Sequence, residues 1–222
     1  MRRVHRKRTI RLSFGVLFVF IAGAVSTCKA GARSESPLDR RVKNYSAKAT
    51  DFIHALNLVS EQLGIRFGIE IDKLPATGAV SVYVAKGTVA DVLGALMKYA
   101  PGYRWVHADG VIDVLPADGG SSLLGVQVVR FDVSNATPDQ IRSTLMSLPE
   151  VKAWLVQNDM REHSFLQPFL SSSASGATSV SVHLSNVTVK TLLNLVIQQP
   201  GLHAWSFVQY GDRRQYLNFQ IG

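Results

Sequence analysis

Three neighbouring residues, Glu162-His163-Ser164, offer an acid, a base and a hydroxyl nucleophile, the side-chain types of a hydrolytic triad. A triad is defined by the convergence of its side chains in space, which adjacency in sequence does not supply. The chain has no phosphate-binding glycine motif and no nucleophile elbow. We therefore predict no catalytic residue and no enzymatic activity.

The histidines could serve as metal ligands, but they are scattered singly along the chain. No two of them have the spacing of a metal site, and the single cysteine, Cys28, lies near the N-terminus. We predict neither a metal site nor a cofactor. The six histidines are His5, His54, His107, His163, His183 and His203.

The N-terminus has the layout of a secretory signal peptide. Residues 1–11 contain six basic residues and no acid, and Leu12 to Thr27 form an uncharged, mostly apolar run. As a helix this run would be about 24 Å long, shorter than the roughly 30 Å hydrocarbon core of a bilayer. We predict a signal peptide over residues 1–27 and an exported protein.

Cys28 stands directly at the end of the apolar run. Val25-Ser26-Thr27-Cys28 resembles the lipobox of bacterial lipoproteins, whose cysteine is acylated, although Thr27 stands where that motif prefers Gly, Ala or Ser. On this interpretation Cys28 is a lipidation site that anchors the protein to a membrane, such as the outer membrane. Ala30-Gly31-Ala32 is a competing cleavage site that would discard Cys28 and leave the protein free in the periplasm.

The distribution of charge argues against nucleic-acid binding. Most of the formal net charge of +8 comes from the six basic residues of the leader. Binding to DNA or RNA depends on clustered cations that neutralise phosphates. The rest of the chain is close to neutral, so we predict no nucleic-acid partner.

A segment of the chain occurs twice. The residues from Val80 to Tyr99 align without a gap to a second copy at an offset of 100, and six positions are identical. Val80-Ser81-Val82 returns as Val180-Ser181-Val182, for example. Because the matching residues are of hydrophobic-pattern and helix-capping types, the repeat indicates that one small structural module is used twice.

The hydrophobic periodicity of the first module predicts two helices and four strands. Thr50, followed by Asp51, caps the first helix, Gly64 ends it, and Asp109-Gly110 turns a final hairpin. The strand after Gly64 alternates as a half-buried strand would. In chain order the expected elements are a helix ending at 63, strands 65–71 and 80–84, a helix over 88–97, and strands 103–106 and 111–115.

The second module is predicted to follow the same plan. Val129, Phe131 and Val133 alternate as an opening strand, and Thr137-Pro138-Asp139-Gln140 begins a helix. Residues 158–178 have no counterpart in the first module and are predicted to be a surface loop. The other expected elements are strands 151–156 and 180–184, a helix over 188–197, and strands 205–209 and 216–221.

These elements predict an α+β fold of two tandem small modules, each with two helices packed on short mixed β-sheets. A module of this size buries a modest core. The predicted organisation is a signal peptide over 1–27, a tether over 28–43, a first module over 44–117, a linker over 118–125 and a second module over 126–222 with its insertion at 158–178.

Aromatic side chains are the remaining candidates for a binding surface. They lie on predicted strands, beside the hairpin and around the insertion, where core filling explains most of them equally well. Small modules of this kind offer open sheet edges, to which a partner can add a strand. The candidate partner surface consists of Tyr83, Tyr103, Trp105, Trp154, Phe165 and Phe169.

The first module resembles the secretin and TonB short N-terminal (STN) domain. The resemblance covers residues 44–116, with a diverged copy over 126–221. It implies a small two-helix sandwich, found in the periplasm at the front of outer-membrane secretins and TonB-dependent receptors. The matching residues are Asp51-Phe52-x-x-Ala55-Leu56-x-x-x-Ser60-x-Gln62-x-Gly64, Val80-Ser81-Val82, Thr88-x-x-Asp91-x-Leu93 and the hairpin through Asp109-Gly110.

The resemblance implies a docking component of a secretion, pilus or conjugation machine, with secretin-like envelope proteins as partners and like domains packed in a homo-oligomeric ring. The chain ends at Gly222, so we expect it not to form the channel itself. Two alternatives stay open. One is a periplasmic sensor, and the other is a cell-wall protein that binds or cleaves glycans.

Overall fold

Each copy of the sequence repeat contributes a two-stranded ribbon, helices and strands of a shared sheet. The computed structural model describes residues 36–73, 78–163, 179–210 and 216–222, which lie in one compact unit, Glu35–Gly222. Helices and strands are both abundant in this unit, which confirms the predicted α+β class.

The two repeats have the same succession of elements apart from one extra helix in the second. The elements of the first are η1 (Pro37–Asp39), β1 (Arg41–Ala49), α1 (Phe52–Leu63), β2 (Phe67–Ile71), β3 (Val80–Thr88), α2 (Val89–Met97), β4 (Tyr103–Ala108) and β5 (Val111–Pro116). Those of the second are η2 (Ser122–Gly125), β6 (Gln127–Ala136), α3 (Pro138–Ser147), α4 (Pro149–Gln157), β7 (Arg161–Glu162), β8 (Val180–Thr188), α5 (Val189–Val196), β9 (Ala204–Tyr210) and β10 (Tyr216–Ile221).

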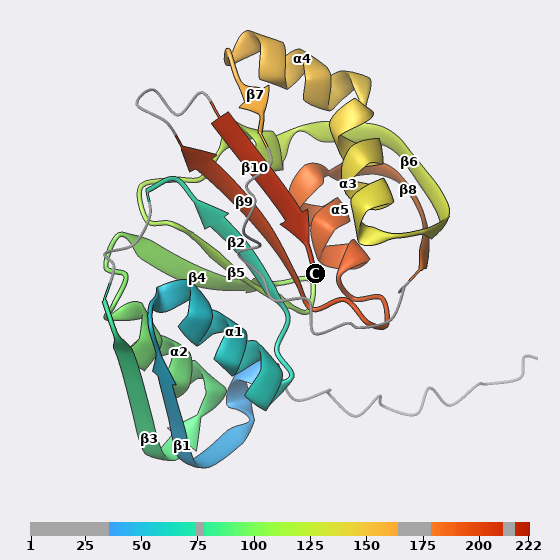
Figure 1. The fold of residues 1–222 in the computed structure, drawn as a ribbon. Helices are drawn as coiled ribbons and strands as arrows, with labels where there is room; N and C mark the ends of the chain where they lie inside the picture. The colour runs from blue at the N-terminus through green and yellow to red at the C-terminus, as the bar shows by residue number, and fades with distance from the viewer. Residues whose placement is uncertain (1–35, 74–77, 164–178, 211–215) are drawn as a thin grey trace, which may run out of the picture. The chain divides into compact units, whose positions relative to one another are not determined.

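Six strands form one mixed sheet in the order β4-β5-β2-β9-β10-β7 (Figure 1). The first three come from the first repeat and the last three from the second. β2 and β9 join the repeats as parallel neighbours, with Phe67 opposite Ala204 and Ile71 opposite Val208. Each half contains an antiparallel hairpin, β4–β5 or β9–β10, whose second strand runs parallel to a third strand, β2 or β7. The sequence repeat is therefore also a repeat of topology.

The helices of the two repeats lie on opposite faces of this sheet. Phe67, Ile69 and Ile71 of β2 pack in the core that contains α1 and α2. Trp205 and Phe207 of β9 pack in the core that contains α3 and α5. The ribbons β1–β3 and β6–β8 contact the outer sides of these helices. The resulting order of layers is ribbon, helices, sheet, helices, ribbon (Figure 1).

Each core includes side chains from the other repeat. The core around α1 and α2 contains Ala204 and Val208 of β9. The core around α3 and α5 contains Val111 and Leu115 of β5. Removing either repeat would expose apolar surface of the other, at a cost of roughly 25 cal/mol per Å². The two repeats therefore stabilise each other.

Segments predicted to connect the modules take part in the fold. The predicted tether, residues 28–43, includes η1 and the start of β1 at Arg41. The predicted linker, residues 118–125, includes η2, whose Leu123 and Leu124 are buried in the core of the second repeat. The two adjacent leucines that follow the polar residues of the predicted linker are therefore core residues of the second repeat.

The two ribbons share one pattern of buried and exposed residues. The patterns of β3 and β8 are identical over all their positions, and β1 and β6 agree along the length of β1 up to its last residue. Their inner faces are therefore equivalent, and the ribbons differ in what they expose. The corresponding buried side chains are Val42, Tyr45 and Ala47 in β1, and Val128, Phe131 and Val133 in β6.

Capping side chains set the helix ends as predicted for α2 and α3, whereas the N-cap of α1 is Asp51 and not the predicted Thr50. Thr88 and Asp91 form a capping box at the start of α2, and Thr137 and Gln140 form one at the start of α3. Gly64 ends α1 in the left-handed conformation, with a φ of 58°. Glycine adopts this conformation without the steric cost that a Cβ would impose.

Two strand predictions are wrong in type or orientation. Residues 151–156, predicted as a strand, lie in α4, because Val151 and Trp154 are buried one helical turn apart while the residues between them are exposed. In β6, Val129 was predicted to face inward but is 64% exposed, and Val128 is buried instead. Val128 and Val129 are both apolar, so the sequence pattern did not show which of the two faces the core.

Other differences concern β1, β2 and the insertion. β1 was missed, because Asn44 adopts a positive φ of 49° and breaks the alternation of buried residues. β2 was predicted as half-buried but is buried at all five positions, because it lies inside the sheet with helices on both faces. Of the predicted insertion, residues 158–163 include β7, and residues 164–178 lie outside the described part of the chain.

Candidate docking surface

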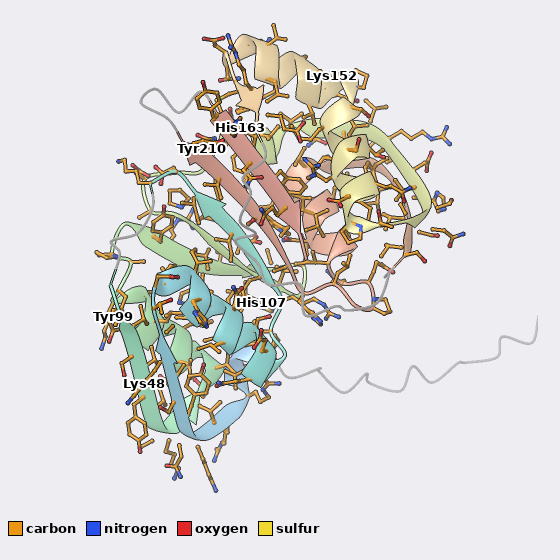
Figure 2. All side chains as sticks on the ribbon, viewed as in Figure 1. Lys48, Tyr99, His107, Lys152, His163 and Tyr210 are labelled. Atoms are coloured by element: carbon orange, nitrogen blue, oxygen red, sulfur yellow. The ribbon has the colours of Figure 1, made fainter. Side chains whose placement is uncertain are left out.

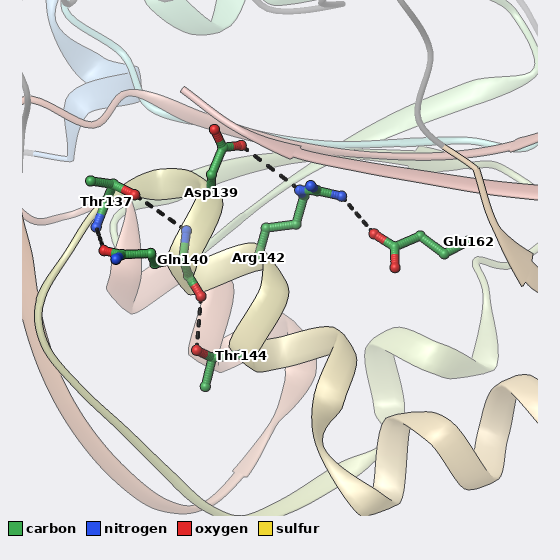
Figure 3. Close-up of polar contacts among 6 residues, drawn as sticks. All are labelled: Thr137, Asp139, Gln140, Arg142, Thr144 and Glu162. Carbon is green, nitrogen blue, oxygen red and sulfur yellow. Dashed lines mark hydrogen bonds and ion pairs between the residues drawn. The ribbon is translucent and has the colours of Figure 1, made fainter.

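Glu162, the acid of the sequence trio, forms an ion pair on the surface of the second repeat. Its Oε1 accepts a hydrogen bond from Arg142 Nη1 at 2.6 Å, and Arg142 Nε lies 3.9 Å from Asp139 Oδ1 (Figure 3). Arg142 comes from α3 and Glu162 from β7. This pair therefore holds the two-residue strand β7 against the helix.

His163, the base of the trio, packs among tyrosines. The Tyr210 hydroxyl and His163 Nδ1 are hydrogen-bonded, and the ring centroids of His163 and Tyr216 are 5.6 Å apart. Figure 2 shows His163 and Tyr210 at the same end of the sheet. Ser164 lies outside the described residues. The contacts of Glu162 and His163 join elements of the fold.

A third histidine, His183, forms another polar contact on the surface, within the β6–β8 ribbon. His183 Nδ1 of β8 lies 3.1 Å from Asp132 Oδ1 of β6, and Asp132 is also hydrogen-bonded to Arg130. The hydrogen bond with Arg130 is the largest cause of a lowered pKa of Asp132, and the contact with His183 adds to it. Across the part of the chain that the structure describes, no group of three His, Cys, Asp or Glu side chains is placed to hold a metal ion.

The predicted aromatic surface does not form one patch. Tyr83 of β3 is 65% exposed, but Trp105 of β4 packs against the first core and Trp154 of α4 is only 8% exposed. Tyr103 stacks on Phe52, with ring centroids 6.5 Å apart. Its hydroxyl donates a hydrogen bond to the backbone carbonyl of Lys73, just after β2. Among the members of the predicted set that the structure describes, Tyr83 is therefore the one with a largely free ring.

Three predicted residues cannot be placed. Phe165 and Phe169 of the partner surface, and the predicted lipidation site Cys28, lie outside the described residues. Tyr99, which the sequence did not single out, is exposed and donates a hydrogen bond from its hydroxyl to the Ser81 carbonyl at 2.7 Å. It extends the surface near Tyr83.

A buried polar chain crosses the junction between the repeats. Trp205 Nε1 of β9 donates to Asn194 Oδ1 of α5 at 2.7 Å, and Asn194 Nδ2 donates to Asp113 Oδ2 of β5 at 3.3 Å. Lys190 Nζ lies 3.6 Å from the same Asp113 oxygen. Burial raises the pKa of Asp113, and the contacts with Asn194 and Lys190 partly oppose this rise. The residues are largely enclosed, so their role is to fix the junction.

Gly68 of β2 makes room for this chain. It lies directly between Asp113 of β5 and Trp205 of β9 in the sheet register. A Cβ at this position would overlap the indole ring of Trp205 and lie 2.6 Å from Asp113 Oδ1. Glycine is required here because the indole occupies the volume of a side chain.

Glu70, two residues further along β2, is a second buried acid at the junction. It is 1% exposed, and its Oε1 accepts a hydrogen bond from the backbone N–H of Ser121, whereas its Oε2 has no partner among the described residues. Burial raises the pKa of Glu70 to about 7, the Ser121 hydrogen bond opposes this, and the charge of Asp72 adds to it. The protonated form is therefore the one that the fold favours.

The outer face of the β1–β3 ribbon carries four exposed cations. Lys43 and Lys86 stand directly opposite each other in the register, and Figure 2 shows Lys48 on the same ribbon. Neither strand contains an acid, and no salt bridge joins these cations to a described residue. Tyr83 lies on the same face. We call this surface the basic ribbon, and its cations are Arg41, Lys43, Lys48 and Lys86.

An open hollow of about 500 Å³ runs beside β1. Its lining consists of seven successive residues, Arg40 to Ser46, together with Gln62 and Leu63 from the end of α1. The Arg40 guanidinium donates to the Leu63 carbonyl, which joins the two walls. The hollow therefore follows a strand edge and has a largely polar lining.

The sequence contained a signal for the basic ribbon that the hydrophobic periodicity of each segment, considered by itself, did not reveal. The burial spacing of β1 equals that of β6 when Arg41 is aligned with Gln127, at an offset of 86 in place of the 100 of the repeat, so a gapped alignment of the two repeats locates β1. Because Arg41 and Lys43 fell in a predicted tether, their charges had no assigned surface. Once β1 is placed beside β3, the four cations gather on one face.

None of the helices in the described residues is long and apolar enough to cross a membrane. Comparisons of the chain with protein-family models, with curated proteins and with solved structures gave no match.

Proposed function

We propose that this protein is an exported, non-enzymatic docking component of a bacterial envelope assembly, such as a secretion, pilus or conjugation machine. The observation that carries the proposal is the pair of two-stranded ribbons on the outer sides of the molecule, each with an exposed face and unpaired strand edges. Such surfaces suit protein partners rather than a small substrate.

Unpaired strand edges support a docking role because their backbone groups remain free to bond. β1 pairs with β3 alone among the described strands, and β6 pairs with β8 alone. β4 forms one end of the six-stranded sheet. Each of these edges presents N–H and C=O groups that a partner strand can bind.

The resemblance of residues 44–116 to the STN domain suggests which partners to test. On this proposal they are secretin-like envelope proteins or other secretion components. The predicted leader places the protein in the periplasm, and an acylated Cys28 would hold it on a membrane. Packing of like domains into a ring belongs to the same proposal.

Site-specific photocrosslinking in cells tests the proposal. A photoreactive residue replaces Ser46 on the outer face of the first ribbon, Asp132 on that of the second, or Arg104 of the edge strand β4, each at an exposed position. The same residue at Lys152 of α4, an exposed helix position, serves as the control. We expect an adduct with an envelope protein from at least one strand position and not from the control.

Failure of the proposal has a clear signature. If none of the three strand positions gives a protein adduct, or if the chain is recovered in the cytoplasm, the docking role is contradicted. Recovery of glycan adducts in place of protein adducts would favour the cell-wall alternative.

A further inference from the structure

We propose that the basic ribbon binds an acidic, extended segment of a partner protein, which adds as a strand along the free edge of β1. This inference rests on the proposed docking function and names the surface and the chemistry of the partner. The occupant is defined by two properties, which are negative charge and an extended backbone.

The first argument is the uncompensated charge of the ribbon. Lys43 and Lys86 face each other across the two strands, and like charges directly opposite one another destabilise a strand pair. No acid of either strand relieves this repulsion. An acidic group of a partner would be attracted to both lysines and would offset their repulsion, so the ribbon favours an anionic occupant.

The second argument is the internal comparison that the repeat provides. The ribbon of β6 and β8 has the same burial pattern, yet its central Arg130 and His183 are both paired with Asp132. Asp132 lies opposite His183, and the equivalent pair in the first ribbon is Ser46 opposite Tyr83. The fold therefore does not require an uncompensated basic face, because the second copy folds with its charges paired.

The third argument is the shape of the hollow beside β1. Seven successive residues, Arg40 to Ser46, line it, so the hollow lies beside the N-terminal part of β1. A segment that occupies six residues of the β1 edge would be about 20 Å long. Alternate side chains of such a segment project from one face, so acids at every second position would lie on the same side as the exposed cations of the ribbon.

These features favour a polypeptide over other polyanions. A sulfated glycan or a phosphate chain can neutralise the cations, but it cannot supply the alternating N–H and C=O groups that an unpaired edge binds. Gln62 in the wall of the hollow offers a further amide to a peptide backbone. The edge and the charge together therefore specify an acidic strand.

Binding of defined probes to the full chain, purified in a non-ionic detergent, tests the inference. The first probe is a fluorescein-labelled peptide of alternating Glu and Val, followed by fluorescence anisotropy. The second is the same peptide with alternate backbone nitrogens methylated, which removes the donors on one edge. The third is a sulfated dextran oligosaccharide of matched charge. We expect the first to bind, with an affinity that falls as salt rises, and the other two to bind at least about tenfold more weakly.

Charge-reversal variants locate the binding surface. Lys43→Glu combined with Lys86→Glu should weaken binding of the first peptide by about tenfold or more. Arg130→Glu on the second ribbon is the matched control, and we expect it to leave binding unchanged. All three substitutions are at exposed positions, and thermal unfolding followed by circular dichroism verifies that each variant is folded.

Several outcomes would overturn the inference. These are unchanged binding by the double variant, equal loss with Arg130→Glu, or equal binding of the methylated peptide or the sulfated dextran. Failure here is distinguishable from failure of the docking function, because crosslinks at Asp132 or Arg104 without any at Ser46 would retain the function and reject this surface.

Discussion

Trp205 donates its indole N–H to the side-chain oxygen of Asn194 at 2.7 Å, with both residues fully buried. Asn194 in turn donates to Asp113 at 3.3 Å, so the pair links the second repeat to the first. A buried oxygen that loses its donor keeps its desolvation penalty, typically about 1–3 kcal/mol. The strength of this junction can therefore be measured by removing a single N–H group.

Trp205→Phe should lower the free energy of unfolding by about 2–4 kcal/mol, from the lost hydrogen bond and the smaller ring. The measurement is urea denaturation followed by tryptophan fluorescence and circular dichroism. Trp154→Phe is the matched control, because Trp154 donates to the Ser122 hydroxyl in a partly buried site that water can reach. A loss at Trp154 equal to that at Trp205 would contradict the assigned role.

Gly68→Ala should destabilise the protein by about 2–4 kcal/mol, since the added methyl group overlaps the Trp205 ring. Gly94→Ala is the control within the first repeat. Gly94 lies in α2 with no atom within 4 Å of a Cβ, so alanine should stabilise the helix by up to about 1 kcal/mol. The two variants should shift the urea midpoint in opposite directions, and a shared direction would count against this packing.

Glu70 should make the stability of the fold depend on pH. Its folded pKa of about 7 lies above its ordinary value of 4.5, so the folded state binds the proton more tightly than the unfolded state. The contribution of Glu70 is therefore most favourable below about pH 4.5 and is lost as the pH rises through about 7. Glu70→Gln should remove this loss and raise the free energy of unfolding above pH 7 by up to about 3 kcal/mol.

Urea denaturation of wild type and Glu70→Gln at about pH 5 and about pH 8 measures this effect. The gap between the two proteins should be larger at the higher pH. Gln keeps an oxygen that can accept the Ser121 N–H, which isolates the effect of the charge. A gap that is equal at both pH values would show that Glu70 does not titrate in this way.

The first repeat, expressed as residues 36–117, should not fold on its own. Its sheet strand β2 would lose β9, and its core would lose Ala204 and Val208. We expect poorly dispersed amide signals in a proton–nitrogen correlation spectrum, compared with the full chain. A dispersed spectrum and a cooperative unfolding transition would show instead that the module is an independent domain.

Cys28→Ala should release the protein from the membrane fraction if Cys28 is acylated. Each buried methylene of an acyl chain contributes about 0.8 kcal/mol, so several chains anchor a protein durably. Cell fractionation and immunoblotting measure the distribution. Unchanged fractionation of the variant would support cleavage at Ala30-Gly31-Ala32 instead.

Local signals predicted α1, α2, α3 and α5, whereas α4 was predicted as a strand. The capping boxes at Thr88 and Thr137 each involve residues only three apart, so no distant partner is needed to recognise them. The repeat likewise identified β3, β8, α2 and α5. These elements depend on residues that are neighbours in the sequence, so they can be recognised without knowledge of the fold.

The junction between the repeats could not be predicted in this way. Gly68, Asp113 and Trp205 meet across three strands, and their identities make sense only when the register is known. The basic ribbon was missed for a related reason. Asn44 interrupts the alternation in β1, so Lys43 and Lys86 could not be placed opposite each other from sequence alone.

The parallel pairing of β2 with β9 also affects how the molecule is assembled after synthesis. Phe67 cannot pair with Ala204 until residue 204 has been synthesised, so the sheet closes only when nearly the whole chain is present. Contacts of such long sequence separation slow folding. If the chain is exported N-terminus first, as its predicted leader implies, the edge of β2 stays unpaired during translocation, and exposed strand edges of this kind favour aggregation.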